Sequence, residues 1–271
     1  MTPFSIVILT LNEADNLPRC LDSIRGCDDI VVLDSGSTDQ TVAIAKARGA
    51  RVVSHPFANF AQQRNFANQA ADIRHEWVFH LDADETFTAK LWHACSTHNL
   101  GDKFDGAWVA PRMMWRNRWL KRCTDYPAWQ ARFVHRDRFN FIEVGHGQRE
   151  APDMRMATFE AGYLHDLSAA GVDAWLEKHR HYALAEAANH QTMLPPPLRD
   201  LGSADALKRR RALKFLSYRL PCRPMLRLIY QYILRGGFLD GKGAWEYCRL
   251  LARYEGFSSA AIRARNEQAD V

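Results

Sequence analysis

The 271-residue sequence lacks the marks of several special classes of protein. Its six cysteines form no Cys-x-x-Cys pair, so a reduced cytosolic compartment is the simpler interpretation. No apolar run approaches the roughly 20 residues of a transmembrane helix. No basic region precedes the short apolar run at the N-terminus, so we expect a buried strand there rather than a signal peptide. The 47% hydrophobic and 25% charged residues exclude a largely disordered chain.

One stretch of the chain lacks acidic residues. Between residues 206 and 239 there are nine Lys or Arg and no Asp or Glu. The whole chain has a net charge of +5, but without these nine residues 27 basic side chains face 31 acidic ones, a net charge of −4. The sequence therefore combines a mildly acidic body with a basic C-terminal segment.

The first hundred residues alternate between apolar runs of strand length and segments with helical periodicity. The expected strands are residues 4–11, 30–33, 51–54 and 77–81, and the expected helices are 17–24, 40–48 and 61–71. Further strands are expected at 107–110, 132–135 and 139–144. This alternation predicts βαβ units and an α/β fold with a parallel sheet, in which ligands bind beyond the carboxyl ends of the strands.

Polar residues follow three of these strands directly. Asn12 and Glu13 follow the first, Asp34 the second, and Asp82 to Glu85 the fourth. Asp82 and Asp84, one residue apart, offer the oxygen ligands that Mg²⁺ and Mn²⁺ prefer. Glu85 is a further candidate ligand, a hydrogen-bond acceptor behind the metal ligands, or an N-cap-like residue of the next helix. Arg64 is a candidate for binding a pyrophosphate, or else a solvated surface arginine.

Together these segments resemble the family 2 glycosyltransferases, which have the GT-A fold. The segments that carry the resemblance are SIVILTLNE (5–13), IVVLDSGSTD (30–39), QRN (63–65) and LDADE (81–85). They are closest to the branch containing lipopolysaccharide-core β-glucosyltransferases. The strong resemblance covers residues 4–90, and weaker matches include YPAWQARF (126–133), GHGQ (145–148) and the pair Leu164–His165. The branch usually has a carboxylate where this chain has Ala128.

The resemblance implies a GT-A nucleotide-sugar-binding (Rossmann-like) mixed sheet flanked by helices, with a helical C-terminal extension. It also implies roles for particular residues. Thr10, Asn12 and Glu13 would line the nucleoside pocket, Asp34 would bind the base, Arg64 would face the diphosphate, and Asp82 and Asp84 would hold the nucleotide and its Mg²⁺ or Mn²⁺.

The implied activity is inverting transfer of a sugar from a nucleotide sugar, such as a UDP-hexose, to a hydroxyl of a cell-surface glycan or lipopolysaccharide-core acceptor. Two alternatives are a sugar-phosphate nucleotidyltransferase and a non-catalytic nucleotide-sugar binding module. The absence of glycine from residues 12–15 counts against the first. The acceptor hydroxyl needs a general base. The candidates are Asp125, Glu143, His146 and Glu150, of which Glu150 and His146 are favoured; a turn histidine and a surface glutamate are the alternatives.

We expect a glycosyltransferase domain at residues 1–192, with a nucleotide-sugar half (1–100) and an acceptor half (101–192), followed by a basic amphipathic helical region (193–271). Helices are expected at 171–191, 203–219, 224–235 and 241–255. Apolar residues are too frequent in this region for a nucleic-acid arm, so an anionic membrane surface is the favoured partner and a packed helical appendage the alternative. The expected location is cytoplasmic, peripheral on the inner face of the cytoplasmic membrane. Four tryptophans are candidates for packing or for stacking on an acceptor sugar: Trp108, Trp115, Trp119 and Trp129.

Overall fold

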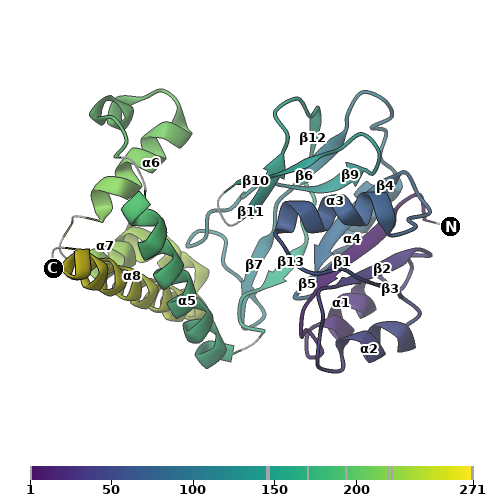
Figure 1. The fold of residues 1–271 in the computed structure, drawn as a ribbon, viewed down its shortest axis with the longest axis horizontal. Helices are drawn as coiled ribbons and strands as arrows, with labels where there is room; N and C mark the ends of the chain where they lie inside the picture. The colour runs from purple at the N-terminus through teal and green to yellow at the C-terminus, as the bar shows by residue number, and fades with distance from the viewer. Residues whose placement is uncertain are drawn as a thin grey trace. The chain divides into compact units, whose positions relative to one another are not determined.

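The computed structural model describes residues 2–144, 147–169, 171–192, 195–218, 220 and 222–269. The chain forms two compact units (Figure 1). The sheet unit comprises the chain up to Met114 and Tyr126–Ala169, and the helical unit comprises Trp115–Asp125 and the chain from residue 170 onward. This division differs from the boundary expected at residue 192, because the helix before that boundary packs along the last helix of the chain.

The sheet unit is built on a seven-stranded sheet in the order β12-β6-β9-β4-β1-β2-β3. Its strands are β1 (Ser5–Thr10), β2 (Ile30–Asp34), β3 (Arg51–Ser54), β4 (Trp77–Asp82), β6 (Gly106–Val109), β9 (Gln130–His135) and β12 (Met156–Phe159). β1 to β4 pair in parallel, whereas β9 runs antiparallel to both β4 and β6. The sheet is therefore mixed, as the predicted fold class requires.

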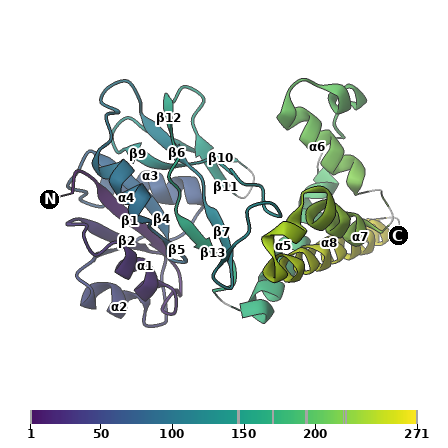
Figure 2. The ribbon, with the colours of Figure 1, turned by 180° about the vertical axis from the view of Figure 1, so that it is seen from behind.

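Helices cover both faces of this sheet (Figures 1 and 2). The helices are α1 (Leu17–Ser23), α2 (Thr41–Ala47), α3 (Phe60–Ala70) and α4 (Ala89–Ser96). Ile6 and Ile8 of β1 pack with α1 and α4 on one face, and Val7 packs with α3 on the other. Because β1 is buried on both faces, its sequence is an unbroken apolar run.

Short strands add to the sheet unit near the end of β4. β5 (Glu85–Thr86) pairs antiparallel with β13 (Leu164–Asp166), which pairs in parallel with β7 (Arg112–Trp115). β10 (Phe141–Val144) and β11 (Gly147–Glu150) form an antiparallel ribbon. The β5–β13 pairing places His165 opposite Glu85, although 80 residues separate them in the chain.

The helical unit contains the C-terminal helices, which overlap the predicted segments, although the last one continues beyond the expected end at residue 255 to Ala269. They are α5 (Gly171–Thr192), η1 (Leu198–Gly202), α6 (Ala206–Ser217), α7 (Arg223–Leu228), the π-helical turns η2 (Ile229–Leu234), η3 (Gly237–Asp240) and α8 (Lys242–Ala269); β8 (Arg118–Trp119) also belongs here. α5 and α8 lie side by side (Figures 1 and 2). Among the described residues, no helix combines the length and apolar composition needed to cross a bilayer.

Candidate active site

The loops that follow β1 and β2 are joined by hydrogen bonds at the carboxyl edge of the sheet. The Asn12 amide donates to Ser37 Oγ (2.8 Å), and the Thr38 amide donates to Asn12 Oδ1 (2.8 Å). The Glu13 amide donates to Thr41 Oγ1 (2.8 Å). Asn12 has a φ of 55°, a left-handed conformation that asparagine tolerates better than most residues. These bonds bring two predicted pocket residues, Asn12 and Glu13, next to the loop after β2.

Asp34, at the end of β2, braces this loop. Its Oδ1 accepts from Thr10 Oγ1 (2.9 Å) and Ser37 Oγ (2.5 Å), and its Oδ2 accepts from the amides of Gly36 (3.0 Å) and Ser37 (2.8 Å). Burial alone would raise the pKa of Asp34, but the bonds from Ser37 and Thr10 lower it. Four donors from this loop and from Thr10 bond to the carboxylate, so Asp34 holds the shape of the loop in this structure. Its bond to a base stays a prediction.

Asp82 lies between two arginines. Its Oδ1 accepts from Arg64 Nη2 (2.8 Å), and its Oδ2 accepts from Arg132 Nη2 (3.0 Å). Burial would raise the pKa of Asp82, but the charges of Arg132 and Arg64 hold it well below its usual range. One carboxylate of the predicted metal-binding pair, Asp82, is therefore paired with guanidinium groups in the structure.

Arg64 is the most deeply buried of the predicted binding residues. Only 1% of it is exposed, and its Nε and Nη1 find no hydrogen-bond partner among the described residues. Two unpaired guanidinium nitrogens carry a desolvation cost. Arg64 is thus not a solvated surface arginine, and it contacts the site through Asp82. Its role toward the diphosphate stays a prediction.

Arg132 is a site residue to which the sequence interpretation assigned no role. The antiparallel pairing of β9 with β4 brings it to the end of β4, where its Nη1 donates to the His80 carbonyl (3.2 Å). Its Nη2 donates to Asp82 and also to Glu85 Oε1 (2.9 Å). In the sequence, Arg132 lies in the segment 126–133, which has a weaker resemblance to the family. That position could have indicated a role in the site.

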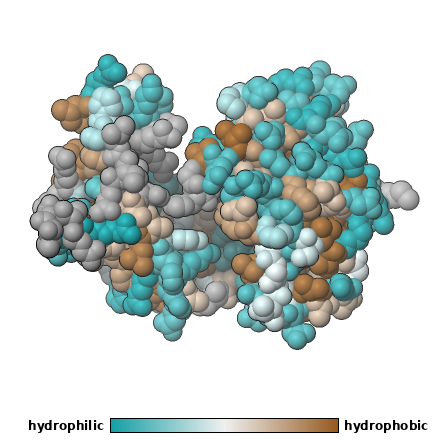
Figure 3. Space-filling view, viewed as in Figure 1, coloured by the Kyte–Doolittle hydropathy of each residue, from teal (hydrophilic) through white to brown (hydrophobic). Residues whose placement is uncertain are grey.

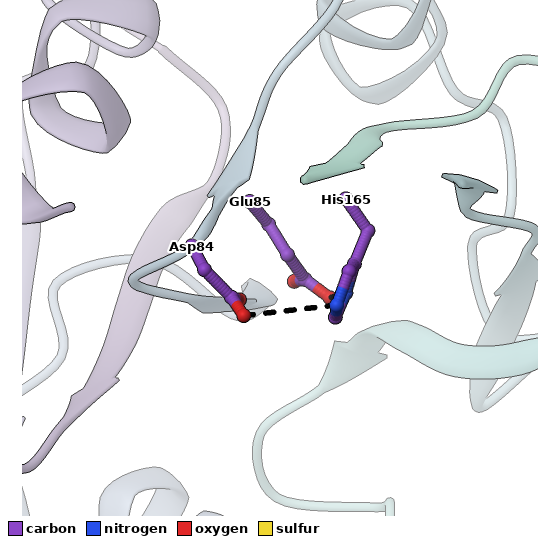
Figure 4. Close-up of side chains that lie close together, drawn as sticks. All are labelled: Asp84, Glu85 and His165. Carbon is purple, nitrogen blue, oxygen red and sulfur yellow. Dashed lines mark hydrogen bonds and ion pairs between the residues drawn. The ribbon is translucent and has the colours of Figure 1, made fainter. Parts of the chain in front are cut away.

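Asp84, Glu85 and His165 form a compact group of potential metal ligands (Figure 4). One ligand atom from each residue lies within 4.8 Å of the others. Asp84 and His165 are partly exposed, whereas Glu85 is fully buried. One imidazole with carboxylates is a donor set that fits Mn²⁺ better than Mg²⁺, because Mg²⁺ prefers oxygen ligands alone.

Glu85 fixes the orientation of the His165 ring. His165 Nδ1 lies 3.1 Å from Glu85 Oε1, and Nε2 lies 3.6 Å from Asp84 Oδ2. Burial would lower the pKa of His165, but the Glu85 hydrogen bond and the charge of Asp84 raise it to about 9. A carboxylate on one imidazole nitrogen, with the other facing a second carboxylate, is the arrangement that orients histidine ligands of metals.

The four candidate general bases have different surroundings. Glu143 accepts a hydrogen bond from Asn59 Nδ2 (3.0 Å), and Asp125 belongs to the helical unit, with an oxygen 3.6 Å from Arg235 Nη1. Glu150, on β11, makes no hydrogen bond or ion pair with the described Asp84, Glu85 or His165 side chains. His146 lies outside the described residues. The choice among these candidates therefore stays a prediction.

Two relatives illustrate the sequence similarity of this chain. An uncharacterised glycosyltransferase of Rickettsia bellii is 38% identical over 88 residues, which are 32% of this chain and 29% of that protein. The lipopolysaccharide core biosynthesis glycosyltransferase LpsC of Rhizobium meliloti is 36% identical over 94 residues, which are 33% of this chain and 34% of LpsC. The chain therefore matches about a third of the length of these curated relatives.

The comparison with solved structures found matches that include two bacterial proteins. The 1–349 fragment of TarS from S. aureus matches 100% of this chain and 91% of its own, with 17% identity and a TM-score of 0.43. Glucosyl-3-phosphoglycerate synthase from Mycobacterium tuberculosis, in complex with Mn²⁺, UDP and phosphoglyceric acid, matches 42% of this chain and 44% of its own, with 27% identity and a TM-score of 0.33.

The model of the family described as glycosyl transferase family 2 matches residues 5–150, more than half of the chain. The match includes β1 to β4, the two hydrogen-bonded loops that follow β1 and β2, and the Asp82–Glu85 segment. It confirms the resemblance found in the sequence and, with the observed α/β architecture, the predicted fold class. The chain belongs to glycosyl transferase family 2.

Proposed function

We propose that the chain is a metal-dependent, inverting glycosyltransferase that moves a sugar from a nucleotide sugar, with a UDP-hexose as donor, to an acceptor hydroxyl. The observation that carries this proposal is the group formed by Asp84, Glu85 and His165 at the end of β4. In a family 2 chain, this group lies where the carboxyl ends of parallel strands form the ligand-binding edge.

The metal ligands in this proposal are Asp84 and His165, through Nε2, and Glu85 holds the imidazole by its other nitrogen. We favour Mn²⁺ over Mg²⁺ because of the imidazole. A bound divalent cation neutralises charge on the diphosphate leaving group. Asp82, Arg64 and Arg132 form the charged support behind these ligands, and Asp82 stays ionised because both arginines contact it.

The nucleoside pocket in this proposal consists of the two joined loops. Thr10, Asn12 and Glu13 line it, and Asp34 maintains its shape through the bonds described above. Pre-formed loops reduce the ordering that binding would otherwise require. Glu150 and His146 are the proposed general bases.

The proposed acceptor is a glycan or lipid-linked glycan at an anionic membrane surface, and the name of LpsC supports a lipopolysaccharide-core acceptor. Trp129 is the proposed platform for an acceptor sugar. It is 43% exposed, whereas Trp115 is fully buried. It immediately precedes β9, whose start lies beside the end of β4 because the two strands are antiparallel. An exposed indole at that edge offers a face on which a sugar ring stacks.

Release of UDP from UDP-glucose tests the proposal. We expect release that depends on Mn²⁺ and falls about a hundredfold or more in Asp84→Asn and His165→Ala. The matched controls, Asp153→Asn and His93→Ala, change exposed residues of the sheet unit and should retain wild-type rates. Wild-type rates in Asp84→Asn would contradict the proposal. So would the absence of nucleoside diphosphate release from every UDP-, GDP- and dTDP-sugar tested.

A further inference from the structure

The helix that runs through α7 and η2 buries polar side chains. Residues 223, 227 and 231, spaced by four, point toward the interior of the helical unit. Arg223 is 7% exposed, and its Nη2 lies 2.7 Å from Glu255 Oε2 of α8. Gln231 is 2% exposed, and its Nε2 donates to the Cys123 carbonyl (3.0 Å). Arg227 also faces Glu255, at 3.9 Å.

The opposite side of the same helix is apolar and faces outward. Its residues follow the same spacing of four and are between 38% and 73% exposed: Met225, Leu226, Ile229, Tyr230, Ile233 and Leu234. A surface helix ordinarily presents its apolar stripe to the core and its polar side to water. This helix does the reverse, and its polar contacts with α8 and residue 123 keep it in that orientation.

The apolar surface continues beyond the helix. Phe238 and Leu239 of η3 and Trp245 of α8 are exposed as well, and Tyr232, Phe238 and Trp245 line one pocket together with Lys242. We name this surface the outer apolar face. It consists of Met225, Leu226, Ile229, Tyr230, Ile233, Leu234, Phe238, Leu239 and Trp245. On the face of the sheet unit that Figure 3 shows, hydrophobic and hydrophilic residues are interspersed, which is ordinary for a protein surface. A contiguous apolar surface marks an interaction site.

Basic side chains border the outer apolar face. A Cβ at Gly241 would meet the Arg118 guanidinium, and one at Gly236 would meet the Arg122 side chain, so both arginines lie against η3. Lys242 lines the aromatic pocket, and the Arg249 guanidinium lies 5.8 Å from the centre of the Trp245 ring.

The carboxylates in the same neighbourhood are paired with arginine. Asp240 accepts from the amides of Arg122 and Cys123, Glu246 lies 2.7 Å from Arg116, and Asp125 lies 3.6 Å from Arg235. Lys242, Arg249 and Arg118 have no ion-pair partner among the described residues. The border of the outer apolar face therefore has an excess of positive charge.

We propose that the outer apolar face docks on an anionic phospholipid surface, with its apolar side chains at the boundary of the headgroups and acyl chains and its basic border on the lipid phosphates. Exposed tyrosine and tryptophan suit the interface, where one part of the ring is wet and the other apolar. Twelve residues of helix are roughly 18 Å long, too short to cross a bilayer, so the helix lies in the interface. This proposal does not depend on the proposed catalytic function.

Vesicle flotation tests the proposal with the full chain. We expect the wild type to float with vesicles of phosphatidylcholine and phosphatidylglycerol, and the Ile233→Asp/Leu234→Asp variant to lose about tenfold or more of that binding. Leu198→Asp is the matched control, because Leu198 is 82% exposed on η1, outside the outer apolar face. Circular dichroism should show equal helix content in all three proteins.

The basic border makes a separate prediction. Lys242→Glu/Arg249→Glu should weaken binding to phosphatidylglycerol vesicles, and added salt should do the same. Equal binding of wild type and Ile233→Asp/Leu234→Asp, or no flotation of the wild type, would overturn the proposal. Light scattering that shows a wild-type dimer, together with a monomeric Ile233→Asp/Leu234→Asp variant and no flotation, would instead assign the face to a second copy of the chain.

Discussion

The two units bury charged side chains in opposite settings. In the sheet unit, apolar strands fill the interior, and one group of buried charges lies at the end of β4, where Arg64 and Arg132 contact Asp82. In the helical unit, Arg223 is buried beneath a helix whose apolar side chains face outward. Buried charge therefore has different consequences in the two units. In the sheet unit it supports a group of potential metal ligands, and in the helical unit it leaves an apolar surface exposed.

The largest expected effect is on the stability of the sheet unit. Arg132→Met removes the donor shared by Asp82 and Glu85 and leaves the partly exposed Asp82 and the fully buried Glu85 with fewer partners. We expect the free energy of unfolding in urea to fall by about 3–5 kcal/mol. Arg25→Met, which breaks the exposed pair with Asp22, should cost far less. Similar losses in the two variants would show that the buried network does not stabilise the unit.

The next effect is on metal binding. Glu85→Gln weakens the hold on His165 Nδ1, so Mn²⁺ affinity should fall about 10- to 100-fold, measured by the paramagnetic resonance signal of free Mn²⁺. Glu246→Gln, in the helical unit, should leave the affinity unchanged. An unchanged affinity in Glu85→Gln would remove the proposed role of Glu85 in orienting the imidazole.

A smaller effect concerns pH and the helical unit. Burial would raise the pKa of Glu186 on α5, but hydrogen bonds from Lys214, Tyr218 and Tyr254 lower it from 4.5 to about 2. Its contribution to stability is therefore complete above pH 4.5 and is lost as the pH falls toward 2. Glu186→Gln should cost about 1–2 kcal/mol near neutral pH and progressively less in acid, measured by urea unfolding. A cost that stays constant with pH would contradict the assignment.

The smallest effect concerns the acceptor. Trp129→Ala should raise the KM for a soluble glycan acceptor about fivefold, equivalent to about 1 kcal/mol, and leave UDP release without acceptor unchanged. Trp129→Phe should keep most of the affinity. Trp245→Ala is the control in the other unit, because Trp245 is 42% exposed and Trp129 is 43% exposed. Equal KM values in the wild type and Trp129→Ala would remove Trp129 from the acceptor site.

The strands β1 to β4 and the helices α1 to α3 could be predicted from the sequence because buried parallel strands are continuous apolar runs and the helices have clear periodicity. The helix α4 and most of the short strands, such as β5 and β13, were not predicted. Asp84 and Glu85 could be located because they follow β4 directly. Arg132 and His165 could not be assigned to the site, since they reach it through strand pairing across 50 and 80 residues of chain. Such pairing depends on the tertiary fold rather than on local pattern.

The C-terminal segment shows a second limit of sequence interpretation. Its periodicity predicts a helix with an apolar and a basic side, but not which side faces the interior. The structure turns Arg223 and Arg227 inward because Glu255 of α8 lies there. The side facing outward is therefore the apolar one, and the positive charge at its border comes largely from outside residues 206–239, from Arg118, Lys242 and Arg249.

The most direct test of the central claim is a titration of Mn²⁺, in the presence of UDP, into the wild type, Asp84→Asn and Ile233→Asp/Leu234→Asp, followed by the resonance signal of free Mn²⁺. We predict one bound Mn²⁺ per chain in the wild type and in the helical-unit variant, and a loss of about tenfold or more in affinity in Asp84→Asn. Equal binding by Asp84→Asn and the wild type would contradict the assignment of the metal site to the end of β4.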